Sequence, residues 1–283
     1  MTPLLSPSRQ HIQVTVDDEQ VNAVQYLASA SRLSIATIKQ AMQKGCVWHK
    51  RGRTLMRLRR AKKALKIGDS IELYYDEKIL SQQVEDAVLI ADEGDFSVWY
   101  KPFAMQCNGS KWGDHTTINR FVETHLTPQR PVFLVHRLDR ATTGLIVLAH
   151  TKAMARTLTQ LFAQRGIDKR YQALVSGDMR EKLPCKSELP IDDKSALTLF
   201  ELAHFNHEQQ RTLLNVQLGT GRKHQIRKHL AAMGFPIIGD RLYGDVSSYQ
   251  ADENLQLCSV LLAFDLDKKS YRFQLPQAFC LSV

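Results

Sequence analysis

The 283-residue sequence has no long run of apolar residues, and this excludes the simplest membrane-spanning architecture. No stretch approaches the roughly 20 consecutive apolar residues that a transmembrane helix requires. The first twenty residues contain no continuous apolar segment either, so we expect no signal peptide. These absences together favour a protein of the cytoplasm that does not bind membranes.

Cysteine is sparse, and its distribution argues against disulfides and bound metal. The five cysteines are scattered and form no C-x-x-C pair: Cys46, Cys107, Cys185, Cys258 and Cys280. This pattern favours reduced structural thiols. The histidines offer no alternative, because His224 and His229 are five apart and do not share a helix face cleanly. His204 and His207 have no acidic or thiol companions at a ligand-like spacing, so we predict no metal site.

Several signatures of other enzyme classes are also missing. The sequence has no G-x-S-x-G elbow for serine hydrolysis. The glycines of Gly219–Gly244 match neither of the common nucleotide-binding loop spacings, so they support no such site. We find no internal repeat and no low-complexity segment. The remaining composition, 43% hydrophobic and 24% charged, is that of an ordinary globular protein with a real core.

One segment lacks acidic residues entirely, and the positive charge of the chain is concentrated there. The net charge is +9, yet the stretch from Lys39 to Lys66 alone holds eleven lysines and arginines and no Asp or Glu. Such a patch favours a polyanionic partner such as RNA, although a solvated basic face is the alternative interpretation. Its candidate RNA-binding residues are Arg51, Arg53, Arg57, Arg59 and Arg60.

The region around this basic patch has the pattern of a small domain over residues 11–76. Residues 12–16 alternate like a strand, and apolar residues within 20–30 form a short helical stripe. Ser34 is suited to begin a second helix and Gly45 to end it, and a turn at Gly68-Asp69 precedes another strand. The unit resembles the RNA-binding module named after ribosomal protein S-four, with an unrelated small α/β domain as the alternative. The polar residues 77–87 are predicted to be a linker.

Residues 88–283 are predicted to form a larger domain in which short strands and helices alternate. Two strands surround an Asp-Glu-Gly-Asp turn at its start. Further strands are expected at Leu145–Ala149, Arg170–Ser176, Leu213–Leu218 and Leu261–Asp265. Helices are expected at Ile118–His125, Ala153–Gln164 and His224–Met233.

Three segments of this domain have residue types suited to chemistry. In HRLDRATTGLIVLA, residues 136–149, a polar loop with two arginines and Asp139 runs into a buried strand. The arginines would help to keep a carboxylate ionised, but Asp139 fits a structural ion pair equally well. In KRYQALVSG, residues 169–177, Tyr171 fits an ordinary core aromatic. In GTGRKHQIRKHL, residues 219–230, basic residues follow a glycine turn and are placed to hold phosphate.

Taken together, these segments resemble the RluA family of pseudouridine synthases in content, order and spacing. The matching strings are HRLD with TTGLIVLA, KRYQALVSG, and TGRKHQIRKHL with GFPIIGDRLYG, and Tyr100-Lys101-Pro102 resembles the opening motif. The resemblance implies an α+β fold, in which a central mixed, largely antiparallel sheet is flanked by helices. It also implies an enzyme that needs no cofactor, because the product is an isomer of the substrate.

The resemblance also implies roles for individual residues. Asp139 corresponds to the catalytic aspartate, Tyr171 to the tyrosine that stacks on the target uracil, and Arg227 to the basic partner of the carboxylate. Arg137 corresponds to the arginine that replaces the flipped base, and Leu145 and Ile146 to wall residues. We add as RNA-binding candidates the polar neighbours of these motifs: His136, Arg140, Arg222, Lys223, His224 and Lys101.

Two departures from the family pattern concern the substrate more than the chemistry. The opening motif normally continues Lys-Pro-x-Gly, whereas this chain has Phe103-Ala104, and the region 183–210 matches weakly. We expect a monomer without an obligate protein partner that converts uridine in ribosomal or transfer RNA to pseudouridine. The alternatives are a non-catalytic RNA-binding or ribosome-assembly factor on the same fold, and a DNA-binding module that uses the basic patch.

Overall fold

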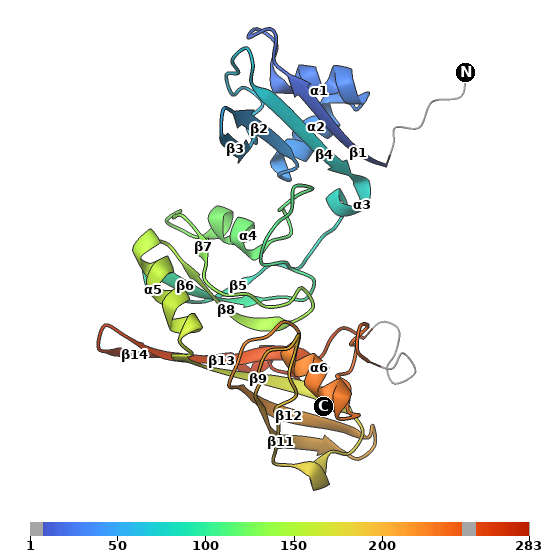
Figure 1. The fold of residues 1–283 in the computed structure, drawn as a ribbon, viewed down its shortest axis with the longest axis vertical. Helices are drawn as coiled ribbons and strands as arrows, with labels where there is room; N and C mark the ends of the chain where they lie inside the picture. The colour runs from blue at the N-terminus through green and yellow to red at the C-terminus, as the bar shows by residue number, and fades with distance from the viewer. Residues whose placement is uncertain (1–7, 245–252, 283) are drawn as a thin grey trace, which may run out of the picture. The chain divides into compact units, whose positions relative to one another are not determined.

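The structure, a computed structural model, describes residues 8–244 and 253–282, and these form two compact units (Figure 1). The first unit comprises the chain up to Val84 together with Asn108–Phe121, and the second comprises Glu85–Cys107 and the chain from Val122 onward. Helix α4 (Ile118–His125) crosses this division. The sequence had not indicated that a segment from the middle of the chain belongs to the N-terminal unit.

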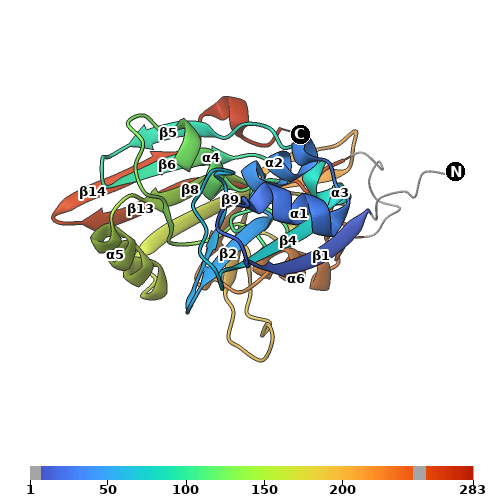
Figure 2. The same cartoon turned by 90° about the horizontal axis from the view of Figure 1, so that it is seen from above.

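The first unit is a four-stranded antiparallel sheet in the order β1-β4-β2-β3, with α1 and α2 packed against it (Figure 2). Its elements are β1 (Arg9–Thr15), α1 (Ala23–Ser31), α2 (Ile35–Gln43), β2 (Val47–Arg51), β3 (Thr54–Arg57), β4 (Ser70–Asp76) and α3 (Glu77–Leu80). Leu27 and Ile38 of the helices share a fully buried core with Ile71 and Leu73 of β4.

Polar side chains set where the two helices of this unit begin. The side chain of Asn22 accepts hydrogen bonds from the backbone N–H groups of Val24 and Gln25, while the Gln25 side chain accepts one from Asn22 N–H. Ser34 accepts from Thr37 N–H and begins α2, as predicted. Both arrangements satisfy N–H groups that have no partner inside a helix.

The second unit is built on a ten-stranded sheet. Eight of its strands follow the order β10-β11-β12-β9-β13-β8-β6-β5, and the other two are β14, which pairs with β13, and β7, which pairs with β8. Its strands are β5 (Val88–Asp92), β6 (Phe96–Lys101), β7 (Phe133–Leu134), β8 (Thr143–Ala149), β9 (Ile167–Ser176), β10 (Cys185–Ser187), β11 (Thr198–Asn206), β12 (Arg211–Leu218), β13 (Leu257–Leu266) and β14 (Lys269–Gln274). Helices α5 (Lys152–Ala163) and α6 (Gln225–Ala232) pack against it. Among the described strands only β8 and β13 pair in parallel, which confirms the predicted mixed, largely antiparallel sheet.

The parallel contact between β8 and β13 depends on a glycine. Gly144 has φ +103°, a value that side chains rarely allow, and it pairs with Ser259. A Cβ atom at this position would lie 2.2 Å from the backbone oxygen of Ser259. Gly144 therefore lets the two strands approach directly behind the HRLD loop, and this is a physical reason for glycine in that motif.

Most of the predicted elements are confirmed to within a few residues, but several were missed, among them β7. The predicted linker 77–87 contains the short helix α3, the weakly matching region 183–210 contains β10 and β11, and β14 had no prediction. Within the described residues, no helix has both the length and the apolar character needed to cross a membrane.

Candidate active site

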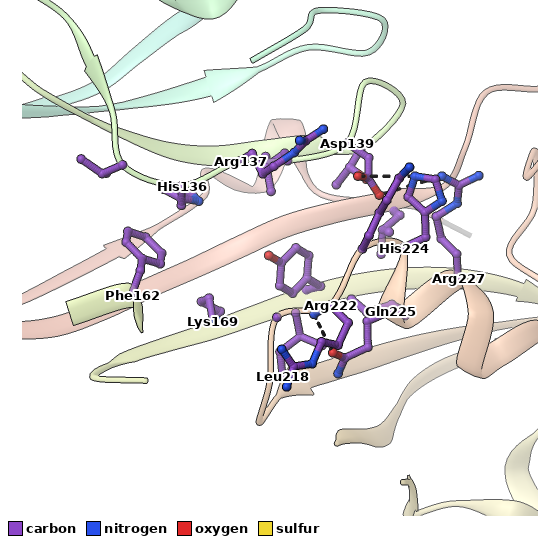
Figure 3. A pocket seen from close by; sticks show the side chains of 18 of the residues that line it. His136, Arg137, Asp139, Phe162, Lys169, Leu218, Arg222, His224, Gln225 and Arg227 are labelled. Carbon is purple, nitrogen blue, oxygen red and sulfur yellow. Dashed lines mark hydrogen bonds and ion pairs between the residues drawn. The ribbon is translucent and has the colours of Figure 1, made fainter. Parts of the chain in front are cut away.

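The second unit contains a cavity of about 460 Å³ into which the three sequence motifs converge (Figure 3). The loop before β8 contributes His136–Asp139, the end of α5 contributes Phe162, and β9 contributes Lys169 and Tyr171. The segment from the end of β12 into α6 supplies Gly221–Arg227. The predicted candidates of this unit that line the cavity are Asp139, Tyr171, Arg227, Arg137, His136, Arg222, Lys223 and His224.

Asp139 presents its carboxylate to two cationic or polar side chains at one end of this cavity. Its Oδ1 lies 3.6 Å from Nε2 of His224, and its Oδ2 lies 3.9 Å from Nη1 of Arg227. Both distances are too long for a hydrogen bond. The Asp139 side chain is 20% exposed and accepts no hydrogen bond from any residue in 8–244 or 253–282. Its oxygens are therefore held near positive charge while remaining open to a reactant.

Arg227 is fixed by a different carboxylate, which the sequence did not identify. Its Nε and Nη2 donate to the two oxygens of Asp240 at 2.8 and 2.7 Å, and both side chains are almost fully buried. Burial opposes both charges, but the hydrogen bonds prevail: they raise the pKa of Arg227 and lower the pKa of Asp240. This pair occupies two nitrogens of the guanidinium, so that Nη1 is the nitrogen that faces Asp139.

His224 occupies the position before α6 where a capping residue normally stands. It has φ +56° and makes no capping hydrogen bond, because its ring is used elsewhere. Nδ1 lies 2.9 Å from the hydroxyl of Tyr243, and the opposite nitrogen faces Asp139. Burial lowers the pKa of His224. The GDRLYG string thus positions both partners of Asp139, through Asp240 for Arg227 and through Tyr243 for His224.

Tyr171 lies in the middle of the sheet, where β9 is paired on both sides. It is opposite Val216 of β12 and Ser259 of β13, and is 8% exposed. Burial, together with the charge of Asp139, raises the pKa of Tyr171 well above its usual range. Its phenol is therefore protonated at neutral pH, and its ring forms a rigid part of the cavity lining.

The loop that begins α6 is tied to the region 183–210 by Gln225. Its buried side chain accepts hydrogen bonds from Thr220 Oγ1 and Arg222 N–H, and donates to Leu197 O and Thr198 Oγ1. Arg222 also donates to Ser195 O. The region whose role was open in the sequence therefore supports the loop that carries Arg222, Lys223 and His224.

His136 supports the HRLD loop from inside. Its Nε2 accepts a hydrogen bond from Val147 N–H at 2.9 Å, and its ring stacks on Phe162 with centroids 4.2 Å apart. Since Nε2 accepts, the ring proton must be on Nδ1. Burial, reinforced by the charge of Lys169, lowers the pKa of His136 to about 3. These contacts assign His136 a structural part in addition to the RNA contact that we predicted.

We expect His136 to make the protein less stable in mild acid. Its pKa is about 3 when folded and about 6.5 in an unfolded chain, so protons bind preferentially to the unfolded chain. The stabilising contribution is complete above about pH 6.5 and is lost as the pH falls from there toward 3. His136→Gln keeps an acceptor for Val147 N–H but does not titrate. In urea unfolding, the free energy of the variant should fall less between pH 7 and pH 5 than that of the wild type; equal falls would contradict this assignment.

Lys101 requires a correction, because it is fully buried and its ammonium is not available to RNA in this structure. Nζ donates to the carbonyl oxygens of Pro102 and Met105 at 3.0 and 2.9 Å. Burial lowers the pKa of Lys101 to about 8. The lysine holds a turn in which Ala104, at the position of the family glycine, has φ +62°. The departure in sequence thus retains the backbone conformation that a glycine would adopt.

The other candidates of this unit differ in exposure. Arg137 is exposed at the cavity, and Lys223 is exposed beside it. Arg140 is also exposed, and its Nε donates to Ala104 O at 3.2 Å. Leu145 and Ile146 are fully buried in β8, behind the loop, and do not line the cavity.

In the first unit, part of the basic patch is neutralised by acids from outside the 39–66 segment. Arg51 donates to both oxygens of Asp69 at 2.8 and 2.6 Å. Arg57 and Arg59 both pair with Asp114, which lies in the segment Asn108–Phe121. Arg53 and Arg60 are exposed. Counting charges along the chain therefore overstated the charge that is free to meet RNA, because the fold brings distant carboxylates to the patch.

Comparison with known proteins finds relatives over much of the chain. A family model described as RNA pseudouridylate synthase matches residues 95–232. The chain is 35% identical to the dual-specificity RNA pseudouridine synthase RluA of Pasteurella multocida, over 51% of this chain and 73% of that protein. It is 28% identical to an uncharacterized RNA pseudouridine synthase of Aquifex aeolicus, over 90% and 88%. With the ribosomal large subunit pseudouridine synthase D of Vibrio cholerae it shares 30% identity over 62% of this chain and 59% of that protein.

A solved structure shares the fold. Human RNA pseudouridylate synthase domain containing 1 superimposes with a TM-score of 0.58 and 22% identity, covering 70% of this chain and 86% of that one. The likeness of residues 11–76 to the S-four module stays a prediction. The family predicted from the HRLD and GRKHQIR strings is confirmed: the chain belongs to the RNA pseudouridine synthases.

Proposed function

We propose that this enzyme isomerises specific uridines in structured ribosomal or transfer RNA, with Asp139 as the catalytic carboxylate. The proposal rests on the surroundings of the Asp139 carboxylate. The carboxylate lies in a cavity with a buried tyrosine, faces His224 and Arg227, and accepts no hydrogen bond within the described chain. A structural ion-pair partner would instead be engaged in the way that Asp240 is.

The reaction is an isomerisation in which atoms and charge balance without a co-reactant. The bond between uracil N1 and ribose C1′ breaks, the base turns, and a bond forms between C5 and C1′. The hydrogen of C5 is lost and N1 gains one. An ionised Asp139 can start this sequence by attacking C1′ or by removing a sugar proton. In either case the uridine must first leave the RNA stack, at a cost of a few kcal/mol.

The surrounding residues fit the requirements of this reaction. The ring of Tyr171 restrains the detached uracil so that it turns in place, since a base that drifts away cannot rejoin the sugar. Arg137 is exposed at the cavity and is placed to fill the gap left by the flipped base. Arg222 and Lys223 supply positive charge for phosphates beside the cavity. In the first unit, the exposed Arg53 and Arg60 are the strongest remaining RNA-binding candidates.

The choice of RNA rests on the relatives. The Vibrio cholerae relative is named for the large ribosomal subunit, and the Pasteurella multocida relative is named as dual-specific. These names describe those proteins, and they favour structured cellular RNA as the substrate here. Cells from which the gene is deleted should lose one or a few pseudouridines when cellular RNA is mapped at single-nucleotide resolution.

A complementation experiment separates catalysis from the alternative of a non-catalytic RNA-binding or assembly factor. Wild-type protein should restore the missing pseudouridines, whereas Asp139→Asn produced at the same level should restore none. If no pseudouridine disappears on deletion, and the purified protein releases no tritium from RNA labelled at uridine C5, the enzymatic proposal fails. Restoration of growth by Asp139→Asn without modification would support an assembly factor.

A further inference from the structure

Lys169 is a half-buried cation for which residues 8–244 and 253–282 supply no partner. Its side chain has no hydrogen bond or ion pair in the part of the chain that the structure describes, and burial together with Arg165 lowers its pKa. Most lysines in such a position gain a carboxylate or a ring of carbonyl groups, as Lys101 does in the same unit. A cation that is desolvated and left unpaired costs stability, which indicates that an anion completes it.

The position of Lys169 relates it to the catalytic cavity. It lies two residues before Tyr171 on β9, so both side chains project from the same face of the sheet about 7 Å apart along the strand. In Figure 3 Lys169 lies toward the Phe162 end of the cavity, away from Asp139 and Arg227. It therefore does not serve the reacting carboxylate. Its Nζ approaches the glycine turn before α6, where a Cβ on Gly221 would be 3.8 Å away.

A second cavity, of about 620 Å³, begins at Lys169. Lys169 and Leu218 line both cavities, so the two adjoin at this lysine. Two further cations, Arg165 and Arg272, line the second cavity and are exposed.

One of the two acids of the second cavity is held in an ion pair. Asp168 pairs with Arg170 at 3.0 Å, and Asp265 accepts a hydrogen bond from Ser270. Asp265 keeps its charge, but the three cations Lys169, Arg165 and Arg272 outnumber it, so the cavity keeps a positive balance for a ligand.

We infer that Lys169, with Arg165, binds the phosphate that joins the target uridine to its neighbour, and that the neighbouring nucleotide occupies the second cavity. This inference rests on the proposed function, because it places the uridine in the first cavity. When the target uridine occupies the first cavity, the RNA on one side of it must pass the rim of that cavity. The rim at Lys169 is cationic, and beyond it lies the second cavity, which is large enough for a nucleotide. Two cations that line the same cavity, Lys169 and Arg165, suit a phosphate better than a neutral base.

Salt dependence of RNA binding tests the inference. Full-length wild type, Lys169→Met, Lys169→Arg and the control Lys152→Met, an exposed lysine at the start of α5, are titrated against a fluorescein-labelled RNA hairpin with a uridine loop in increasing KCl. Lys169→Met should weaken binding and lower the slope of log affinity against log salt by about 0.7, the value for one phosphate of a single strand. Lys169→Arg and Lys152→Met should keep the wild-type slope.

A second arm uses the RNA instead of the protein. Neutral methylphosphonate linkages are placed one at a time in the loop. At one position the linkage should weaken binding to the wild type clearly more than it weakens binding to Lys169→Met, in which only Arg165 is left to meet that phosphate. An unchanged slope in Lys169→Met overturns the inference. A lower turnover with an unchanged slope also overturns it, because Lys169 would then act on the detached uracil. In both cases tritium release by the wild type would leave the proposed function standing, and its absence in the wild type would refute that function instead.

Lys169→Met should fold as the wild type does. Lys169 has no partner to lose in the described chain, and methionine fills the same space without a buried charge. Lys169→Met should therefore unfold at the same temperature as the wild type or at a higher one. If Lys169 serves RNA binding and not folding, its replacement by methionine should raise or preserve the unfolding temperature and lower the affinity for RNA.

Discussion

Replacing Asp139 by asparagine should abolish pseudouridine formation while leaving a folded, RNA-binding protein. The loss expected for removing the reacting group of an enzyme is about 10⁴-fold or more. Asparagine has the same size, and the contacts that the carboxylate loses are pairs at 3.6 and 3.9 Å, so the change in the free energy of unfolding should be about 1 kcal/mol or less. Removing a negative charge beside RNA should leave its affinity unchanged or slightly higher.

Three measurements check this expectation on the same preparations. Tritium release from RNA labelled at uridine C5 reports turnover, filter binding reports RNA affinity, and urea unfolding reports stability. Asp139→Glu is the matched control, because it keeps the charge but displaces it by one methylene. Turnover by Asp139→Asn within tenfold of the wild type would remove Asp139 from the catalytic role.

Asp240→Asn should be the most destabilising single change at the site. It leaves Arg227 charged and buried, and breaking a buried pair in this way costs about 3–5 kcal/mol. The amide still accepts from Leu242 and Tyr243 N–H, so the loss should come mainly from the unpaired arginine. Activity should fall as well, because the nitrogen of Arg227 that faces Asp139 loses its support.

A double variant separates the two effects of Asp240. Arg227→Met with Asp240→Asn has no buried charge at this point, so chemical denaturation should show it to be more stable than Asp240→Asn alone. Its turnover should remain low, since the cationic partner of Asp139 is gone. If the double variant is as unstable as the sum of the two single variants, the two side chains act independently and the positioning role of Asp240 is wrong.

The sequence predicted the elements of the site better than the contacts between them. Periodicity and capping residues located α2, α6 and β9 because these signals are local. Motif strings located Asp139, Tyr171 and Arg227. Asp240 and Tyr243 lie in a string that was recognised, but nothing local shows that their partners are 13 and 19 residues away.

Long-range pairing explains the errors. Lys101 looked like an RNA-binding cation because a lysine is usually exposed, whereas the fold surrounds it with carbonyl oxygens. The basic patch looked free because its acids, Asp69 and Asp114, lie outside the segment that was counted. A charge count along a segment gives the charge available to RNA only where the fold places no carboxylate from elsewhere in the chain beside that segment.

The inclusion of Asn108–Phe121 in the first unit bears on how this enzyme can be shortened. In that unit Asp114 is held by Arg57 and Arg59, Trp48 donates to Lys111 O, and Arg9 stacks over Trp112. A fragment that ends at Val84 would lack Lys111, Trp112 and Asp114. On the other side of the cut, the half-buried Asp114 carboxylate and Trp112 would lose their partners in the first unit. The N-terminal unit therefore depends on a segment from the middle of the chain, and a shortened enzyme that is to keep this unit intact must keep Asn108–Phe121 as well.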